Sequence, residues 1–440
     1  MNMMAATLAH PPPTVATGID LSAALPDPDA PAPSVAADAV AAVAALRSAI
    51  ARGRPTPAGP PAVRPAPPPA SFRDRAAAGT AQREADFAGG VDVPEGTTIT
   101  DIAIQVEPGV WMPVTLAIPP SASPATPAPA LVWLHATGSG RGAMRARLLA
   151  AAAAGFVGVA PDARWHGDRA EAGAGGGGGS RAGYEGALVA AWKRATTTTP
   201  ATPAVPPRPF LLDTVWDCQR LLDWMVMKEG GKEGDDEPTV TTLSSPLSSC
   251  ILSSSIGVSG VSLGGMHAWL LTVADDRIAA AAPAIGLQSF AWAAAAEEEG
   301  GGVQGVGTGS AGAWKARAAS IPAVFAAAAA DRGLVQPDAP TFAAVLDAIA
   351  PGLRDAYDAP HSLAAACPRP FLIVSGGDDP RCPLPGIEWA VRRAERVYGE
   401  RKDAPPGSLR WSVYKGVGHE MMAGMDAEVL AWMGRWLKTR

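Results

Sequence analysis

The sequence is short of several residue types, and each shortage excludes a class of protein. Cysteine occurs four times in 440 residues, at Cys218, Cys250, Cys367 and Cys382. These spacings fit neither a zinc site nor a disulfide framework, so we expect reduced, core-filling thiols. No Lys or Arg precedes Arg47, whereas secretory signals and organelle transit peptides are basic. The expected compartment is therefore the cytosol, with a plastid or mitochondrion as alternatives.

Long apolar runs and basic clusters are also scarce. The longest apolar window, 148–161, is too short and too often interrupted by glycine to span a bilayer, so no membrane span is expected. The net charge is −6 and no Lys/Arg cluster is interleaved with aromatic residues, which argues against a nucleic-acid partner. No Gly-Lys-Ser/Thr follows the five-glycine run within 170–180, and no metal or nucleotide cofactor is indicated.

Changes in composition along the chain indicate where its parts begin and end. The predicted parts are a disordered tail at 1–33, a helix at 34–53, a proline-rich linker at 54–94, and a main domain at 95–440 with a cap-like helical region at 287–366. Ser34 is the expected N-cap of the first helix and Gly53 its stop. This helix and its linker are a candidate docking element for a partner. Glycine-rich or polar insertions are expected at 170–180, 228–249 and 297–312.

The main domain alternates strand-like and helix-like segments. Residues 97–106 and 110–119 predict an antiparallel pair of strands. Further strands are expected at 131–135, 156–161, 256–260, 278–286, 371–376 and 409–416, with helices at 141–155, 211–228, 264–276, 386–399 and 426–437. Nearly continuous apolar strands are typical of a sheet covered on both faces. The pattern predicts an α/β fold with a mainly parallel central sheet and helices on both faces.

Ser262 lies in the pentapeptide Gly-Val-Ser-Leu-Gly, between the strand ending at residue 260 and the helix starting near Gly264. The chain contains 48 glycines, so a chance match to this pentapeptide is not rare and the motif alone is weak evidence for a nucleophile. The strand-turn-helix setting is what a nucleophile elbow requires, because the serine must adopt a strained backbone at the carboxyl end of a strand. The pattern therefore makes Ser262 a candidate nucleophile.

A serine nucleophile needs a base, and the base needs a carboxylate. Asp378 and Asp379 follow the strand at 371–376, and His419 follows the strand at 409–416, which gives the order Ser, Asp, His. Of the six histidines, only His419 lies between a late strand and the final helix. We prefer Asp379 to Asp378 as the carboxylate, because Pro380 fixes the turn directly after it.

An oxyanion hole would complete such a site with two backbone N–H groups. The N–H of Leu263, next after the candidate nucleophile, is one candidate donor. The loop after the strand at 131–135 should supply the other, and Thr137 in "HATGSG" is our choice. The alternative is that this loop is only a glycine-rich strand exit.

Taken together, these residues resemble the α/β-hydrolase superfamily. The resemblance is to the branch with dienelactone hydrolases, acetyl xylan esterase-like enzymes and prolyl oligopeptidase catalytic domains. "GVSLGGMHA", "SGGDDPRCPL" and "GVGHEM" are its most specific pieces. More narrowly, the chain resembles uncharacterised plant and algal members, whose pattern includes a stretch similar to "PAIGLQSFAW". The resemblance implies an α/β-hydrolase fold with Ser262 as nucleophile, Asp379 as acid and His419 as base.

The expected activity is hydrolysis of a carboxylic ester or related acyl bond, in a small-molecule substrate, through an acyl-enzyme on Ser262. No feature separates an ester from a thioester or a lactone. Two alternatives stay open: a hydrolase-fold protein that binds or senses a small ligand without cleaving it, and a serine peptidase for small peptides. The first 95 residues are too short and unrepeated for the β-propeller of prolyl oligopeptidases, which weakens the peptidase alternative.

Overall fold

The computed structural model describes residues 26–57, 59–69, 92–170, 180–196, 210–227, 244–295 and 312–438. The chain divides into two compact units, each built from separate stretches of sequence. The sheet unit comprises Ile50–Ala187, Leu211–Ala284 and Met421–Arg440. The helical unit comprises Met1–Ala49, Leu188–Phe210 and Ile285–Glu420.

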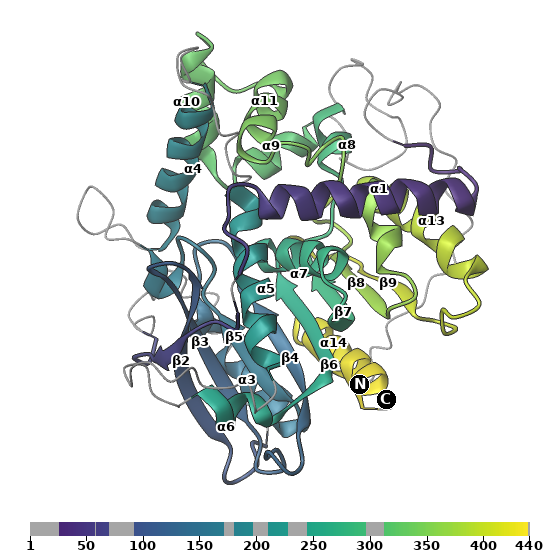
Figure 1. Cartoon of the computed structure of the whole chain (residues 1–440). Helices are drawn as coiled ribbons and strands as arrows, with labels where there is room; N and C mark the ends of the chain where they lie inside the picture. Colours follow the sequence, from purple (N-terminus) through teal and green to yellow (C-terminus); the bar gives the residue numbers. More distant parts are fainter. Residues whose placement is uncertain are drawn as a thin grey trace. The chain divides into compact units, whose positions relative to one another are not determined.

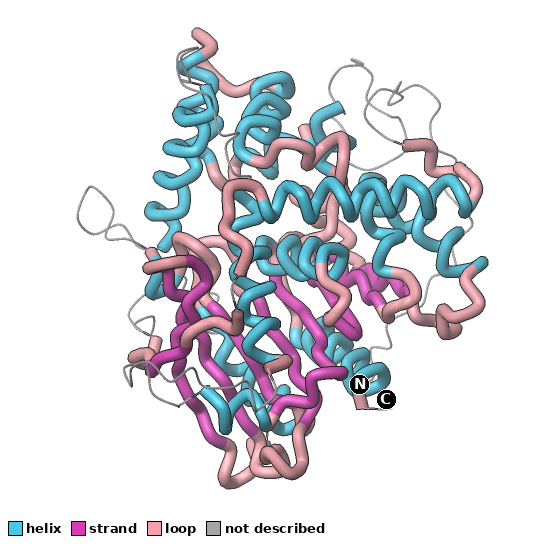
Figure 2. The backbone as a smooth tube through the Cα atoms, viewed as in Figure 1, coloured by secondary structure: helices cyan, strands magenta, loops and turns pink. Residues whose placement is uncertain are grey.

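Among the described residues, seven strands form the centre of the sheet unit, in the spatial order β1-β2-β3-β5-β4-β6-β7. Figure 2 shows strands in magenta. The seven strands are β1 (Val63–Pro65), β2 (Thr98–Glu107), β3 (Val110–Ile118), β4 (Ala128–Leu134), β5 (Val157–Pro161), β6 (Ile251–Val261) and β7 (Ile278–Ala284). The pairs from β1 through β3 to β5 are antiparallel, and those from β5 through β4 and β6 to β7 are parallel. The predicted antiparallel pair is thus β2 and β3, followed by the expected parallel strands.

Helices cover both faces of this sheet. The longer ones are α3 (Arg145–Ala153), α5 (Asp213–Met225), α7 (Leu263–Ala274) and α14 (Ala423–Leu437). A side chain at Gly257 of β6 would clash with Met433 and Leu437 of α14, whereas one at Gly260 would clash with Gly264 of α7. Because side chains alternate along a strand, residues three apart face opposite sides. Helices α14 and α7 therefore lie on opposite faces, as Figure 1 also shows.

A buried ion pair joins α3 to α14. The Arg147 guanidinium donates to both carboxylate oxygens of Asp426, at 2.7 and 2.9 Å, and the two side chains are only 8% and 3% exposed. Burial raises the pKa of Asp426 above its ordinary value even though Arg147 lowers it. The carboxylate thus depends on Arg147 to compensate its lost hydration.

The helical unit contains β8 (Phe371–Gly376) and β9 (Leu409–Tyr414), which pair in parallel. The described parts of the predicted cap-like region, 287–295 and 312–366, are largely helical. They contain α8 (Phe290–Ala295), α9 (Ala313–Ala318), α10 (Pro322–Asp331), α11 (Ala339–Ile349) and α12 (Ala359–Ser362). Aromatic packing joins α9, α10 and α11: the Phe325 and Phe342 rings stack at 5.4 Å, and Trp314 lies 6.2 Å from Phe342.

The N-terminal segment is tied to α13 (Leu384–Glu400) in the same unit. Arg393 is 1% exposed and donates to Pro360 O, to Asp27 O and to the Asp38 carboxylate, the last at 2.5 Å. Trp389 donates its indole N–H to Pro26 O at 2.7 Å. Residues 26–31, which the sequence predicted as the end of a disordered tail, are therefore held by α13.

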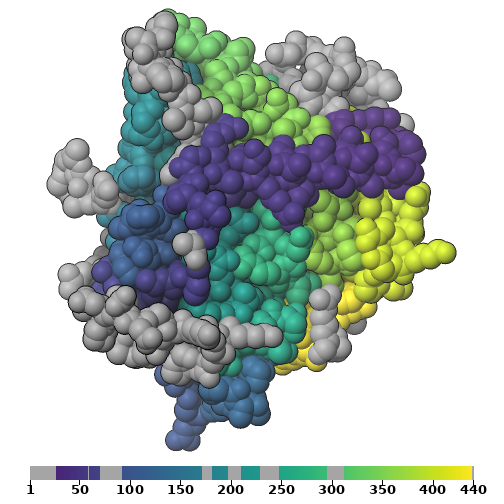
Figure 3. All heavy atoms as spheres, viewed as in Figure 1, coloured from purple at the N-terminus to yellow at the C-terminus, as the bar shows by residue number. Residues whose placement is uncertain are grey.

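Helix α1 (Ala32–Ala51) begins two residues before the predicted start. Pro33 falls in its first turn, where proline needs no N–H partner. The helix ends just before Gly53, whose φ of +64° takes the chain out of the helix. By length and composition α1 could cross a membrane. One side packs inward through Val35 and Leu46, while its outer side is open to view in Figure 3.

The structure differs from the sequence analysis at further places, among them part of a predicted insertion, which forms helix α6 (Ser244–Ser249). The predicted linker contains strand β1, whose three residues pair with β2. Helix α4 (Ser180–Thr196) was not predicted. The predicted tail up to residue 25, linker residues 70–91, and most of the three predicted insertions (171–179, 228–243 and 296–311) lie outside the described residues.

Candidate active site

Ser262 occupies a strained turn between β6 and α7. Its φ of +55° lies in the left-handed region, which residues with a side chain rarely adopt. Its N–H donates to Ala284 O at the end of β7, and its carbonyl accepts from Met266 N in the first turn of α7, both at 3.0 Å. The turn is thus held from both sides, and it places Ser262 directly after the last residue of β6.

The glycines on either side of Ser262 allow this turn. A Cβ at Gly264 would lie 2.0 Å from Leu134 O, and one at Gly260 would lie 2.4 Å from Gly264. No real Cβ tolerates either distance. Helix α7 therefore passes against the end of β4 only because both positions lack a side chain, which brings the elbow next to the loop that starts at His135.

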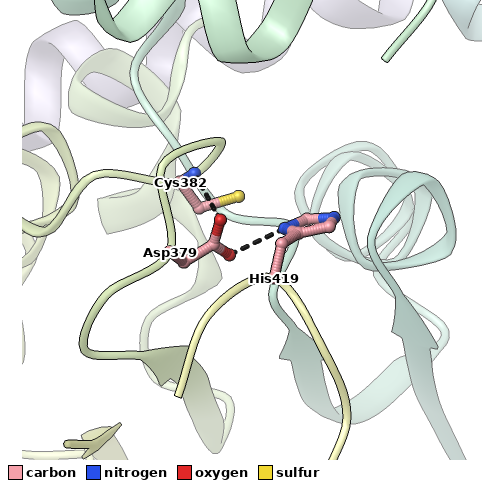
Figure 4. Close-up of side chains that lie close together, drawn as sticks. All are labelled: Asp379, Cys382 and His419. Atoms are coloured by element: carbon pink, nitrogen blue, oxygen red, sulfur yellow. Dashed lines mark hydrogen bonds and ion pairs between the residues drawn. The ribbon is translucent and has the colours of Figure 1, made fainter. Parts of the chain in front are cut away.

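Asp379 and His419 meet in the helical unit (Figure 4). Asp379 follows β8, His419 follows β9, and Nδ1 of His419 lies 2.8 Å from Oδ2 of Asp379. A Cβ at Gly376 would lie 2.3 Å from Gly418 O, so the loops after these strands meet closely where glycine permits. Asp378, which directly precedes Asp379, is exposed and does not take this position.

The surroundings of this pair set the protonation of both members. Burial would raise the pKa of Asp379, but hydrogen bonds from His419 and from the N–H groups of Arg381 and Cys382 bring it below its ordinary value. Burial lowers the pKa of His419 below 6.5, although Asp379 opposes this shift. At neutral pH the pair is a carboxylate and a neutral imidazole. The Nδ1 proton bonds to Asp379, which leaves Nε2 with a lone pair.

The loop after β4 is fixed by His135. Its Nδ1 donates to Ala136 O at 2.9 Å, and its Nε2 accepts the N–H of Ala163 at 3.0 Å. Burial lowers the pKa of His135, so the ring is neutral, as this pairing needs. Thr137 follows directly in a turn that the Ser139 N–H closes onto Ala136 O at 3.2 Å. This loop is therefore an ordered turn beside the elbow.

An arginine-carboxylate network supports the same loop. Arg141 is 1% exposed and donates through Nη1 to Asp162 at 2.7 Å and to Asp168 at 2.5 Å. Asp162 also accepts the Arg141 N–H at 2.7 Å, and its carboxylate fills the space where Gly167 would carry a Cβ. Burial would lower the pKa of Arg141, but these two carboxylates raise it. Because the network links the loops after β4 and β5, we expect it to keep the Thr137 region rigid.

The sequence matches no protein-family model and no curated protein. Among solved structures, a Bacteroides fragilis protein described as a candidate acetyl xylan esterase is 13% identical, with a TM-score of 0.51, over 95% of this chain and 86% of that one. Only a shared fold follows at this identity. The chain has the α/β-hydrolase fold.

Two further solved structures match this α/β-hydrolase-fold chain with lower TM-scores. An acetyl xylan esterase from Paenibacillus sp. R4 is 16% identical, with a TM-score of 0.46, over 89% of this chain and 99% of that one. An acylaminoacyl peptidase from Pyrococcus horikoshii is 13% identical, with a TM-score of 0.46, over 78% of this chain and 42% of that one. None of the three is a plant or algal protein, so they do not support that narrower resemblance.

Within the hydrolase fold, the structure brings together two groups of the predicted site residues. Ser262, Leu263 and Thr137 belong to the elbow and the adjacent loop of the sheet unit. Asp379 and His419 are hydrogen-bonded in the helical unit. Sequence analysis missed Cys382, whose sulfur lies close to this Asp-His pair. It also missed Arg141 and Asp162, which support the loop that carries Thr137.

Proposed function

We propose that this protein is a serine hydrolase that cleaves a carboxylic ester or related acyl bond. Ser262 attacks the acyl carbon, and His419 takes the hydroxyl proton at Nε2. Asp379 holds the imidazole through Nδ1 and stabilises the imidazolium that forms. The N–H groups of Leu263 and Thr137 stabilise the oxyanion. Water then attacks the acyl-enzyme with His419 as base again, which releases the acid and restores Ser262.

The observation that carries the proposal is the positive φ of Ser262. Such strain costs on the order of 1–3 kcal/mol and persists where a function needs it. The first residue of α7 is Leu263, so its N–H is one of those without a partner inside the helix. The neutral imidazole beside a buried carboxylate supplies the base that such a serine requires.

Hydrolysis of short aryl esters by the purified full-length chain tests the proposal. We expect turnover by the parent and almost none by Ser262→Ala, with Ser259→Ala as the matched control. Ser259 lies on β6 and donates to Ala282 O, so its hydroxyl is already engaged within the sheet. The proposal is wrong if Ser262→Ala cleaves the esters as fast as the parent. A folded parent that cleaves none of them would instead favour ligand binding without cleavage.

Replacing Thr137 with proline tests the second oxyanion donor. Proline removes the backbone N–H, and loss of one donor lowers kcat by about 100 to 1,000-fold. Thr137→Ala keeps the N–H and should retain most of the activity. Steady-state kinetics of both variants on one ester make the comparison, with circular dichroism to show that each is folded. Equal rates for the two variants would mean that a different N–H fills this role.

The pH profile of kcat/KM should rise with pH and level off above an acid limb whose midpoint lies below 6.5. Only neutral His419 can accept the serine proton, and its pKa is lowered from 6.5 by burial. Activity is therefore lost as pH falls through this lowered pKa and is retained above it. Initial rates at low substrate concentration between pH 4 and 8 (about the range in which a histidine titrates) measure the midpoint. A midpoint above 7 would contradict the assignment.

A further inference from the structure

Cys382 adds a third metal-binding atom to the Asp379–His419 pair. One ligand atom from each of the three residues lies within 4.8 Å of the others, and Cys382 and Asp379 are buried. Among the described residues, this is the group of Asp, Cys and His side chains that lies close enough together to hold a metal ion. Figure 4 shows the three side chains converging, with the ring nitrogen that contacts Asp379 on the side of the Cys382 sulfur.

The local turn explains why the cysteine lies there. Asp379 Oδ1 accepts the N–H of Arg381 at 2.8 Å and that of Cys382 at 3.2 Å, so the chain folds back over the carboxylate. The Cys382 sulfur then lies 3.3 Å from Ile285 O and 3.4 Å from Nη2 of Arg317. These contacts hold the thiol beside the pair, although core filling alone would not require that position.

We propose that Asp379, Cys382 and His419 form an inhibitory site for Zn²⁺. A thiolate, an imidazole and a carboxylate are the ligands that this ion prefers, and three protein ligands leave its fourth position for water. Ligand atoms that bind zinc at about 2.0–2.3 Å lie closer to one another than the 4.8 Å within which the three atoms lie here. Binding therefore requires small movements of the side chains. The proposal rests on the proposed function for its effect on activity, but not for the binding itself.

Charge and protons balance in this site. Zn²⁺ replaces the thiol proton of Cys382, which passes to solvent, so the ion is neutralised by one thiolate and one carboxylate. The Arg317 guanidinium beside the sulfur favours its charged form, although burial raises the pKa of the free thiol to about 12. With zinc on Nδ1, the imidazole proton moves to Nε2. His419 can then no longer accept the Ser262 proton, and hydrolysis stops until the ion is removed.

Cobalt binding tests the site without relying on activity. Titrating the metal-free, full-length chain with Co²⁺ should produce an ultraviolet thiolate-to-cobalt charge-transfer band that saturates at one ion per chain. Cys382→Ser should abolish the band and weaken Zn²⁺ binding, measured by calorimetry, at least tenfold (loss of a supporting residue alone typically costs about 10 to 100-fold). Cys367→Ser removes a half-buried thiol outside the cluster and should leave the band intact. His419→Ala, which removes a second ligand, should also weaken binding.

Inhibition by Zn²⁺ is then measured on the same full-length protein. Ester hydrolysis should fall as Zn²⁺ is added and return fully with a chelator, and Cys382→Ser should need at least about tenfold more Zn²⁺ for the same fractional loss. A parent without the cobalt band, or a band unchanged in Cys382→Ser, overturns the site. A parent that binds Co²⁺ through Cys382 but cleaves no ester in chelator overturns the proposed function and leaves the metal site standing.

Discussion

Replacing Asp379 with asparagine is expected to lower kcat for ester hydrolysis by about 10⁴-fold. Asparagine keeps the size of the side chain but can donate a hydrogen bond to Nδ1, which favours the tautomer with its proton on Nε2. The imidazolium also loses the carboxylate that stabilises it. Steady-state kinetics on an aryl ester, with folding followed by circular dichroism, measures the loss.

The matched control is Asp378→Asn at the neighbouring position. Asp378 is exposed, and its backbone N–H donates a hydrogen bond to Val417 O at 2.9 Å. The substitution leaves this backbone contact in place. It should leave kcat within about twofold of the parent, because a single exposed charge changes little nearby. Similar losses in the two variants would show that the turn, rather than the Asp379 carboxylate, matters.

Replacing Arg147 with alanine is expected to lower the free energy of unfolding by about 3 to 5 kcal/mol. The change leaves Asp426, 3% exposed, as a buried carboxylate without its partner between α3 and α14. Urea denaturation followed by tryptophan fluorescence measures the loss. Trp133 of β4 is a suitable reporter, because it is fully buried with the Arg147 guanidinium 5.7 Å from its ring.

Two controls separate the buried charge from the loss of an arginine. Arg354→Ala removes an arginine whose partner, Asp347, is 53% exposed, and it should cost less than about 1 kcal/mol. The double variant Arg147→Ala/Asp426→Leu should be more stable than Arg147→Ala, because no unpaired carboxylate remains. If the double variant is less stable than the single one, the cost does not come from the unpaired charge.

The Ser262 turn was the most predictable part of the site. Its strand, its helix and its glycines are adjacent in sequence, so local pattern alone fixes the positive φ that the structure shows. The choice of Asp379 over Asp378 rested on the following proline. Burial of one carboxylate and exposure of the other agree with that choice, but this difference depends on how the loops after β8 and β9 pack.

The site contacts that sequence analysis missed join residues that are far apart in the chain or brought together by a turn. Arg141 and Asp162 are 21 residues apart, and no periodicity links them. The sulfur of Cys382 lies near His419 only because the turn folds back over Asp379. By contrast, helix α4 was within reach of prediction: Tyr184, Leu188 and Trp192 are spaced by four residues and all are buried. The glycine run before it concealed that periodicity.

The parallel strands were found because their apolar runs are continuous, and the fold was predicted correctly from them. Strand β1 was missed because its three residues lie in a proline-rich stretch, and they form a strand through their pairing with β2. Residues 26–31, at the end of the predicted tail, are held through backbone carbonyls and aspartates that α13 arginines bind. Such contacts leave no trace in local composition.

The most direct measurement of the central claim is fluorophosphonate labelling of the purified full-length chain, with the modified residue mapped by mass spectrometry. Only a serine activated by a nearby base reacts readily with this probe. We expect one labelled residue, Ser262, and no labelling in Ser262→Ala or His419→Ala. Labelling at another serine, or a folded parent that stays unlabelled, would contradict the account of Ser262 as a nucleophile served by His419.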